Sequence, residues 1–283
     1  MAIRIITDSA CDVTRAMEEQ YGIEIIPLQV NIDGKVYRDR EDITPDVVYE
    51  KMREGAVPKT SLVLSDRLSD TFKKYAQAGD EVIYISFSSA LSGSYNLAKL
   101  TAEDVCVEYP DFKVEVIDSK CASFGQGVVV IFAMQALEKG ATYDELVAKI
   151  QDWSDNMEHI FTVDDLEYLY RGGRVSKTSK VLGGLLGIKP ILHVSDEGKL
   201  VPLEKCRGQK KTLARMVDIM GELNPDIGNT TVGIIHADSA DVAEEVRNMV
   251  VEKYGCKDIL MSELGAVIGA HAGPGTIAIF FLS

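Results

Sequence analysis

Short apolar segments alternate with amphipathic ones through the first half of the chain. Apolar runs at 3–6 and 81–86, and a further strand pattern at 114–118, are each followed by a segment with helical periodicity. Continuous apolar strands that alternate with helices are typical of a parallel sheet covered on both faces. We therefore predict an α/β fold whose N-terminal part is a mostly parallel sheet flanked by helices.

Capping and turn residues predict where several of these elements begin and end. Asp12 is expected to cap a helix that ends at Gly22. Thr44 and Pro45 predict the start of another helix, because proline is favoured in a first helical turn. The sequence NIDGKVY at 31–37 has the turn residues of a β-hairpin.

The second half of the chain follows a different pattern. Two strand patterns at 191–205, separated by Ser-Asp-Glu-Gly, predict an antiparallel hairpin, and further helices and strands follow it. This order is typical of a mixed α+β domain. A helical segment at 141–157 bridges the halves, so we predict an N-terminal α/β domain at 1–157 and a C-terminal α+β domain at 158–283.

Composition and charge exclude several classes of function. The 283 residues are 46% hydrophobic and 26% charged, as in ordinary globular proteins. A net charge of −14 disfavours binding to nucleic acid or to anionic membranes. The longest strongly apolar run, at 128–134, is too short for membrane insertion. Five scattered cysteines and an N-terminus unlike a leader predict a cytoplasmic protein with reduced thiols and no metal site.

Small polar residues follow three of the predicted strands, at 7–9, 86–94 and 118–119. Ligands of open α/β sheets bind outside the carboxyl ends of the strands, and helix N-termini there suit anions. Single residues of these types are most often helix caps. The segment 86–94, however, carries five serines within nine residues, which is more than one cap requires. We therefore expect an anion site that includes Ser92.

The surrounding residues favour a carboxylate as this anion. The chain has no phosphate-binding glycine loop, and 86–94 contains no lysine or arginine to neutralise a phosphate. Hydroxyls, amides and one histidine can hold a carboxylate. Such groups occur at 58–61, PKTS, and at 265–275, where four glycines surround His271 and indicate unusual dihedrals or close approach. A fatty acid would supply a carboxylate together with an apolar tail.

Seven motifs carry a family resemblance: TDSACD, PKTS, SSALSGSY, DSKCASFGQG, VDDLEYLYRGGRVS, GIKPIL and IGAHAGPGTIAIFF. In this order, from Ile3 to Phe281, they resemble the successive motifs of the DegV family. The resemblance implies one DegV-like unit over 3–282, in which two domains enclose a long-chain fatty acid such as palmitate between them. It further implies a non-catalytic carrier, without cofactor or metal, that presents the acid to a fatty acid kinase for acyl-phosphate formation.

The resemblance also assigns individual residues. It implies that five small or hydrogen-bonding residues lie at the carboxylate: Thr60, Ser61, Ser92, Gly93 and His271. Leu62 and Val63 stand where the family often has glutamine and proline, so the loop shape is expected to differ there.

Four basic residues lie within ten positions at the end of a predicted helix: Arg171, Arg174, Lys177 and Lys180. Gly172 and Gly173 are expected to end this helix. The resemblance associates the two arginines with partner docking, away from the carboxylate-binding segments. The alternative is a solvated helix C-terminus, where cations are favourable and exposed charges contribute little.

Two catalytic alternatives remain open. One is an acyl hydrolase with Ser92 as nucleophile and His271 as base, although the serine is not in a G-x-S-x-G elbow. The other is a metal-dependent phosphotransferase that uses Asp8 and Asp118, which lack an accompanying phosphate loop.

Overall fold

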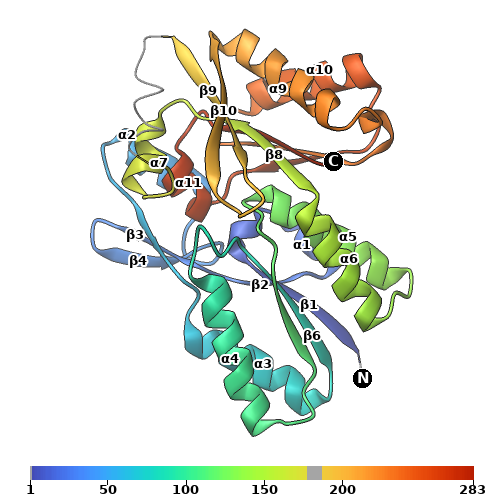
Figure 1. Cartoon of the computed structure of the whole chain (residues 1–283). Helices are drawn as coiled ribbons and strands as arrows, with labels where there is room; N and C mark the ends of the chain where they lie inside the picture. The colour runs from blue at the N-terminus through green and yellow to red at the C-terminus, as the bar shows by residue number, and fades with distance from the viewer. Residues whose placement is uncertain (1, 177–186) are drawn as a thin grey trace.

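The computed structural model describes residues 2–176 and 187–283, whose strands form three sheets (Figure 1). The first is a four-stranded parallel sheet in the order β2-β1-β6-β7. Its strands are β1 (Ile3–Asp8), β2 (Glu24–Ile26), β6 (Glu81–Ser86) and β7 (Val114–Asp118). The predicted mostly parallel sheet is therefore confirmed, at the predicted strand positions.

Helices cover both faces of this sheet, with α3 (Ser65–Ala78) and α4 (Ser94–Glu108) on one side and α5 (Phe124–Glu138) and α6 (Tyr143–Asp155) on the other (Figure 1). Helix α5 also packs against the six-stranded sheet of the second half, so it is enclosed between two sheets. This position explains its continuous apolar run, because a helix that is apolar all round is buried.

The first helix begins later than the sequence predicted. Helix α1 (Arg15–Tyr21) is capped by Thr14, whose hydroxyl accepts a hydrogen bond from Met17 N. Asp12 is buried in a left-handed conformation and caps no helix start, so the prediction that it caps this helix is wrong. The predicted end at Gly22 is confirmed.

A small antiparallel sheet lies beside the first, in the order β4-β3-β5. Its strands are β3 (Gln29–Ile32), β4 (Lys35–Arg38) and β5 (Lys59–Ser61), and α2 (Pro45–Arg53) lies between β4 and β5 in the chain. The hairpin predicted at 31–37 and the helix start at Pro45 are both confirmed. Strand β5 carries the PKTS motif to the edge of this sheet.

The second half forms a six-stranded mixed sheet in the order β10-β9-β8-β13-β11-β12. Its elements are β8 (Met157–Thr162), β9 (Ile188–Val194), β10 (Leu200–Arg207), α9 (Gln209–Leu223), β11 (Val232–His236), α10 (Ala240–Tyr254), β12 (Ile259–Glu263) and β13 (Ile277–Leu282). The antiparallel β9–β10 hairpin and the mixture of helices and strands in this half were predicted. The domain division at residue 157 stays a prediction, since one buried core joins side chains of both halves.

Two short helices lie where the halves meet: α7 (Leu166–Arg171) and α11 (Ala266–Ala272). Helix α11 follows a strand of the second half but packs against α2, β3 and β5 of the first half (Figure 1). The glycine-rich segment around His271 therefore contains a helix, where the sequence suggested a loop. No helix in the described part of the chain is long and apolar enough to cross a membrane.

Candidate functional site

A predominantly apolar cavity lies between the two halves of the molecule, with α11 as one wall. Together with the space at its open mouth it measures about 770 Å³. Both halves contribute apolar side chains to its lining, among them Leu28 and Leu91 from the first half and Leu200 and Phe280 from the second. A ligand held here would be mostly hydrocarbon.

Several polar side chains line the cavity, and His271 is one of them. Its ring nitrogen Nε2 lies 2.7 Å from Thr60 Oγ1, a hydrogen bond between residues 211 positions apart in the chain. Ser92 also lines the cavity, and its hydroxyl lies 2.9 Å from Ser94 Oγ at the start of α4. The structure thus brings the predicted Thr60, Ser92 and His271 into one cavity.

The other two residues expected at the carboxylate are placed differently. Ser61 and Gly93 are exposed and are not part of the cavity lining. Ser61 follows Thr60 in a strand, and successive side chains of a strand point to opposite faces. Gly93 caps the start of α4 on its outer side.

The two arginines expected to share a docking surface are separated by the turn that ends α7. Gly173 adopts a left-handed φ of 73°, and Arg174 N donates a hydrogen bond to Leu169 O at 3.0 Å. This turn directs Arg174 inward, so it lines the cavity, whereas Arg171 stays exposed and pairs with Glu167 at 2.9 Å. Arg174 thus departs from the expectation that the basic stretch lies away from the carboxylate-binding segments. Lys177 and Lys180 lie outside the described residues.

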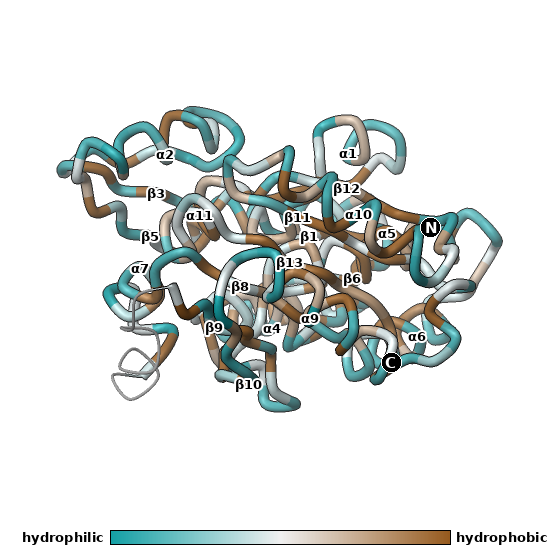
Figure 2. The backbone as a smooth tube through the Cα atoms, turned by 90° about the horizontal axis from the view of Figure 1, so that it is seen from above, coloured by the Kyte–Doolittle hydropathy of each residue, from teal (hydrophilic) through white to brown (hydrophobic). Residues whose placement is uncertain are grey.

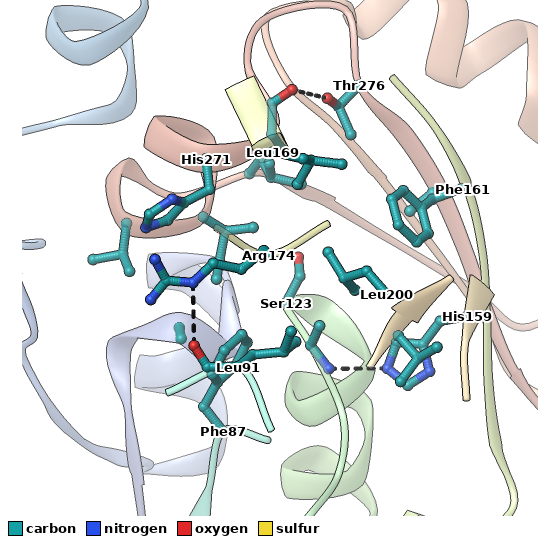
Figure 3. Close-up of a pocket in the computed structure, with 18 of the residues that line it drawn as sticks. Phe87, Leu91, Ser123, His159, Phe161, Leu169, Arg174, Leu200, His271 and Thr276 are labelled. Atoms are coloured by element: carbon teal, nitrogen blue, oxygen red, sulfur yellow. Dashed lines mark hydrogen bonds between the residues drawn. The ribbon is translucent and has the colours of Figure 1, made fainter. Parts of the chain in front are cut away.

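Arg174 and His271 together create a site of single positive charge. Figure 3 shows the Arg174 guanidinium beside the His271 ring, and Arg174 Nε donates to Leu91 O at 3.2 Å. Burial, followed by the nearby Arg174 charge, lowers the pKa of His271 to about 4, so the ring is neutral at neutral pH. One guanidinium with neutral hydrogen-bonding groups suits a singly charged carboxylate.

A glycine allows the histidine to occupy this place. A Cβ atom at Gly172 would overlap His271 Nδ1, so the backbone after α7 can pass the ring only because residue 172 has no side chain. The close approach that the sequence predicted for the glycines of 265–275 occurs there against other side chains: Asp12, Tyr49, Tyr168 and Asp164.

The opposite end of the cavity carries a second histidine that the sequence analysis missed. Figure 3 shows His159 and Phe161 on the side away from His271 and Arg174. His159 Nε2 accepts from Ala122 N at 3.1 Å, and Nδ1 lies 2.9 Å from Met157 O, which fixes the proton on Nδ1. Only the alternation of β8, which places 157, 159 and 161 on one face, could have indicated this histidine.

This histidine gives a testable pH dependence of stability. Burial lowers the pKa of His159 to about 4, below the ~6.5 of an unfolded histidine. The unfolded chain therefore binds the extra proton first, and stability is lost as the pH falls from about 6.5 to 4. When the pH falls from 7 to 4.5, we expect the free energy of unfolding of wild type to decrease by about 2–3 kcal/mol more than that of His159→Gln, as measured by urea unfolding.

Buried acids oppose this trend equally in both proteins, because burial raises the pKa of Asp8 and of Asp39 to about 6. Their contribution cancels in the difference between wild type and variant. An equal loss of stability in the two proteins would show that His159 is not held neutral.

The residues of the catalytic alternatives have other partners. Ser92 bonds to Ser94 and His271 to Thr60, and no hydrogen bond joins Ser92 to His271 among the described residues. Asp8 accepts backbone amides of Phe87 and Ala10, and Asp118 accepts those of Ser89 and Lys120. Within residues 2–176 and 187–283, no group of three or more potential ligands could hold a metal ion.

A second hollow, called here the outer hollow, adjoins the cavity and is less apolar than it. Its lining includes Lys59, Tyr168 and Arg171, and it shares three side chains with the cavity: Thr60, Arg174 and His271. These three side chains form a wall with one face toward the apolar cavity and the other toward the hollow.

Comparisons with known proteins agree over the whole chain. A family model described as an uncharacterised protein of the DegV family matches residues 2–283. A DegV domain-containing protein of Clostridium perfringens is 40% identical over 280 residues, which cover 98% of this chain and 96% of that protein.

Solved structures of similar proteins match as completely. A fatty-acid-binding DegV family protein from Thermus thermophilus is 30% identical, with a TM-score of 0.91 and complete coverage of both chains. A stearic acid-binding protein from Eubacterium ventriosum is 29% identical, with a TM-score of 0.92, over 100% of this chain and 98% of that one.

Proposed function

The chain belongs to the DegV family, and from this premise we propose that it binds a long-chain fatty acid in the cavity without transforming it. The carboxylate would lie at Thr60, Ser92, His271 and Arg174, and the tail along the apolar walls toward His159. The observation that carries this proposal is the pair of Thr60 and His271, with Arg174 beside it, at one end of a predominantly apolar cavity. The fatty acids bound by the two similar solved proteins support it.

The tail supplies most of the affinity. Each buried methylene is worth about 0.8 kcal/mol, so a chain of about fourteen contributes roughly 11 kcal/mol before costs. Association costs at least about 4 kcal/mol, which leaves at most about 7 kcal/mol for the tail, an affinity in the micromolar range. The head-group contacts then orient the acid, with its carboxylate toward the outer hollow.

We further propose that the bound acid is presented, in the cytoplasm, to a fatty acid kinase. The outer hollow would give a partner access to the side chains at the carboxylate, and Lys59 and Arg171 contribute positive charge to it. On a chain whose net charge is −14, such a basic surface favours approach by an acidic partner. Phosphorylation of the carboxylate there would leave the tail in the cavity.

Solvent extraction of the purified protein, followed by mass spectrometry, tests the binding proposal. We expect close to one long acyl chain per protein, or stoichiometric uptake of added palmitate after delipidation. A folded protein that releases no acyl chain and takes up no palmitate would refute fatty-acid binding.

The head-group assignment is tested by removing two hydroxyls. Thr60→Val and Ser92→Ala should each weaken palmitate binding by about 1.5 kcal/mol, because each removes a hydrogen bond to a charged group. Ser61→Ala is the matched control, since Ser61 follows Thr60 in β5 but is exposed outside the cavity. Calorimetric titration that finds the Thr60 and Ser61 variants equally affected would contradict the assignment.

A further inference from the structure

Asp12, the last acid of the TDSACD motif, has a role that the head-group site does not explain. It is 2% exposed, and its carboxylate has two hydrogen bonds. Oδ2 accepts from Ser123 Oγ at 2.6 Å, and Oδ1 accepts from Gly265 N at 3.0 Å. The backbone oxygen of Asp12 also accepts the hydroxyl of Ser262. One buried residue of the first half therefore has two partners in the second half.

These partners stand next to the cavity wall. Ser123 lines the cavity and directly precedes α5, and Gly265 is the N-cap residue of α11. A Cβ atom at Gly265 would lie only 2.5 Å from Asp12 Oδ1, so the start of α11 is pressed against this carboxylate. Nearby, Tyr49 Oη donates to Leu264 O at 2.8 Å and adds a second contact from the first half.

Helix α11 transmits this contact to the site. It has seven residues, and four of them line the cavity: Val267, Ile268, His271 and Ala272. A helix this short moves as one body, because backbone hydrogen bonds join each turn to the next. A shift at Gly265 therefore moves His271, less than two turns away.

We propose that Asp12 is a positioning residue for the fatty-acid site: it holds the start of α11 against the first half and so sets where His271 and the cavity wall lie. Burying a carboxyl group without hydrogen bonds is costly, and each oxygen of Asp12 has one hydrogen-bond partner. A buried group bonded in this way favours one arrangement of its partners over others. The capping of α1 needs no such group, since Thr14 supplies it.

The position of His271 can be measured in the ligand-free protein, by the ring signals of ¹⁵N-labelled histidine. The chain has four histidines, and His271→Gln identifies the signal of His271. We expect Asp12→Ala to shift this signal and to release bound palmitate about tenfold faster or more. Asp12→Asn keeps an acceptor for Gly265 N and should restore both properties to near wild type.

Asp8→Ala is the matched control, because Asp8 belongs to the same motif and is equally buried, but accepts amides of the first half only. It should lower thermal stability without moving the His271 signal. If Asp12→Ala does not fold, Gly265→Ala displaces the same contact from the other side and should shift the His271 signal in the same way.

The positioning role would be overturned if Asp12→Ala or Gly265→Ala showed the same His271 signal and the same palmitate release rate as the control Asp8→Ala. The release rate rests on the proposed function, whereas the His271 signal does not. A wild-type protein that fails to bind palmitate would therefore refute the proposed function and leave the test of Asp12 intact.

Discussion

The Leu200→Trp variant is expected to bind palmitate at least about 100-fold more weakly than wild type. Leu200 is half-buried on the edge strand β10, and its side chain lies in the middle of the cavity between Ser123 and Phe161 (Figure 3). An indole at this place takes the room of several methylenes of the tail. Displacing about four methylenes costs roughly 3 kcal/mol, which corresponds to about 100-fold in affinity.

Leu203→Trp serves as the control, because Leu203 lies on the same strand but is 42% exposed outside the cavity. Palmitate affinity by calorimetric titration and thermal unfolding should both stay near wild type in this control. If Leu200→Trp folds and still binds palmitate as tightly as wild type, the acyl tail does not occupy this cavity.

Substitution of the two arginines is expected to separate binding from delivery. Arg174→Gln should weaken palmitate binding by about 1.5–3 kcal/mol, because it removes the one guanidinium that lines the described cavity and leaves a carboxylate without a cation. Arg171→Gln should leave the affinity unchanged, since Arg171 lines the outer hollow and not the cavity. With a cognate kinase and ATP, Arg171→Gln should instead slow acyl-phosphate formation.

The salt dependence identifies the cause of the slower reaction. Steering by an exposed charge is screened by salt, so the difference between Arg171→Gln and wild type should be largest at low ionic strength. If Arg171→Gln formed acyl phosphate as fast as wild type at every salt concentration, Arg171 would be only a solvated charge at the end of α7. Unchanged palmitate affinity in Arg174→Gln would remove Arg174 from the head-group site.

Local patterns were sufficient to predict most of the fold. The turn residues at 31–37 and the Ser-Asp-Glu-Gly turn after β9 predicted both hairpins, because the backbone conformation of a tight turn depends on its own residues. Apolar runs predicted the parallel strands. The pairing of Thr60 with His271 is different in kind: no local pattern joins residues 211 positions apart, and only the family resemblance placed them together.

Tertiary contacts explain what the sequence did not reveal. Arg171 and Arg174 lie on either side of a glycine turn and have nearly the same sequence context. Even so, Arg174 lines the cavity, whereas Arg171 lies outside it and pairs with Glu167. Asp12 has the sequence of a helix cap, but its partners are more than a hundred residues away. Spacing alone contains no information about such partners.

The wall formed by Thr60, Arg174 and His271, with one face in the cavity and one in the outer hollow, would divide a bound fatty acid into two chemically independent parts. A free fatty acid is a detergent because its tail and its charged end act on water and lipid together. With the hydrocarbon behind this wall, the surfactant property would be suppressed, while the acid group would still be accessible from the outer hollow. Fatty acids bound in this way would not act as detergents on the membranes of the cell.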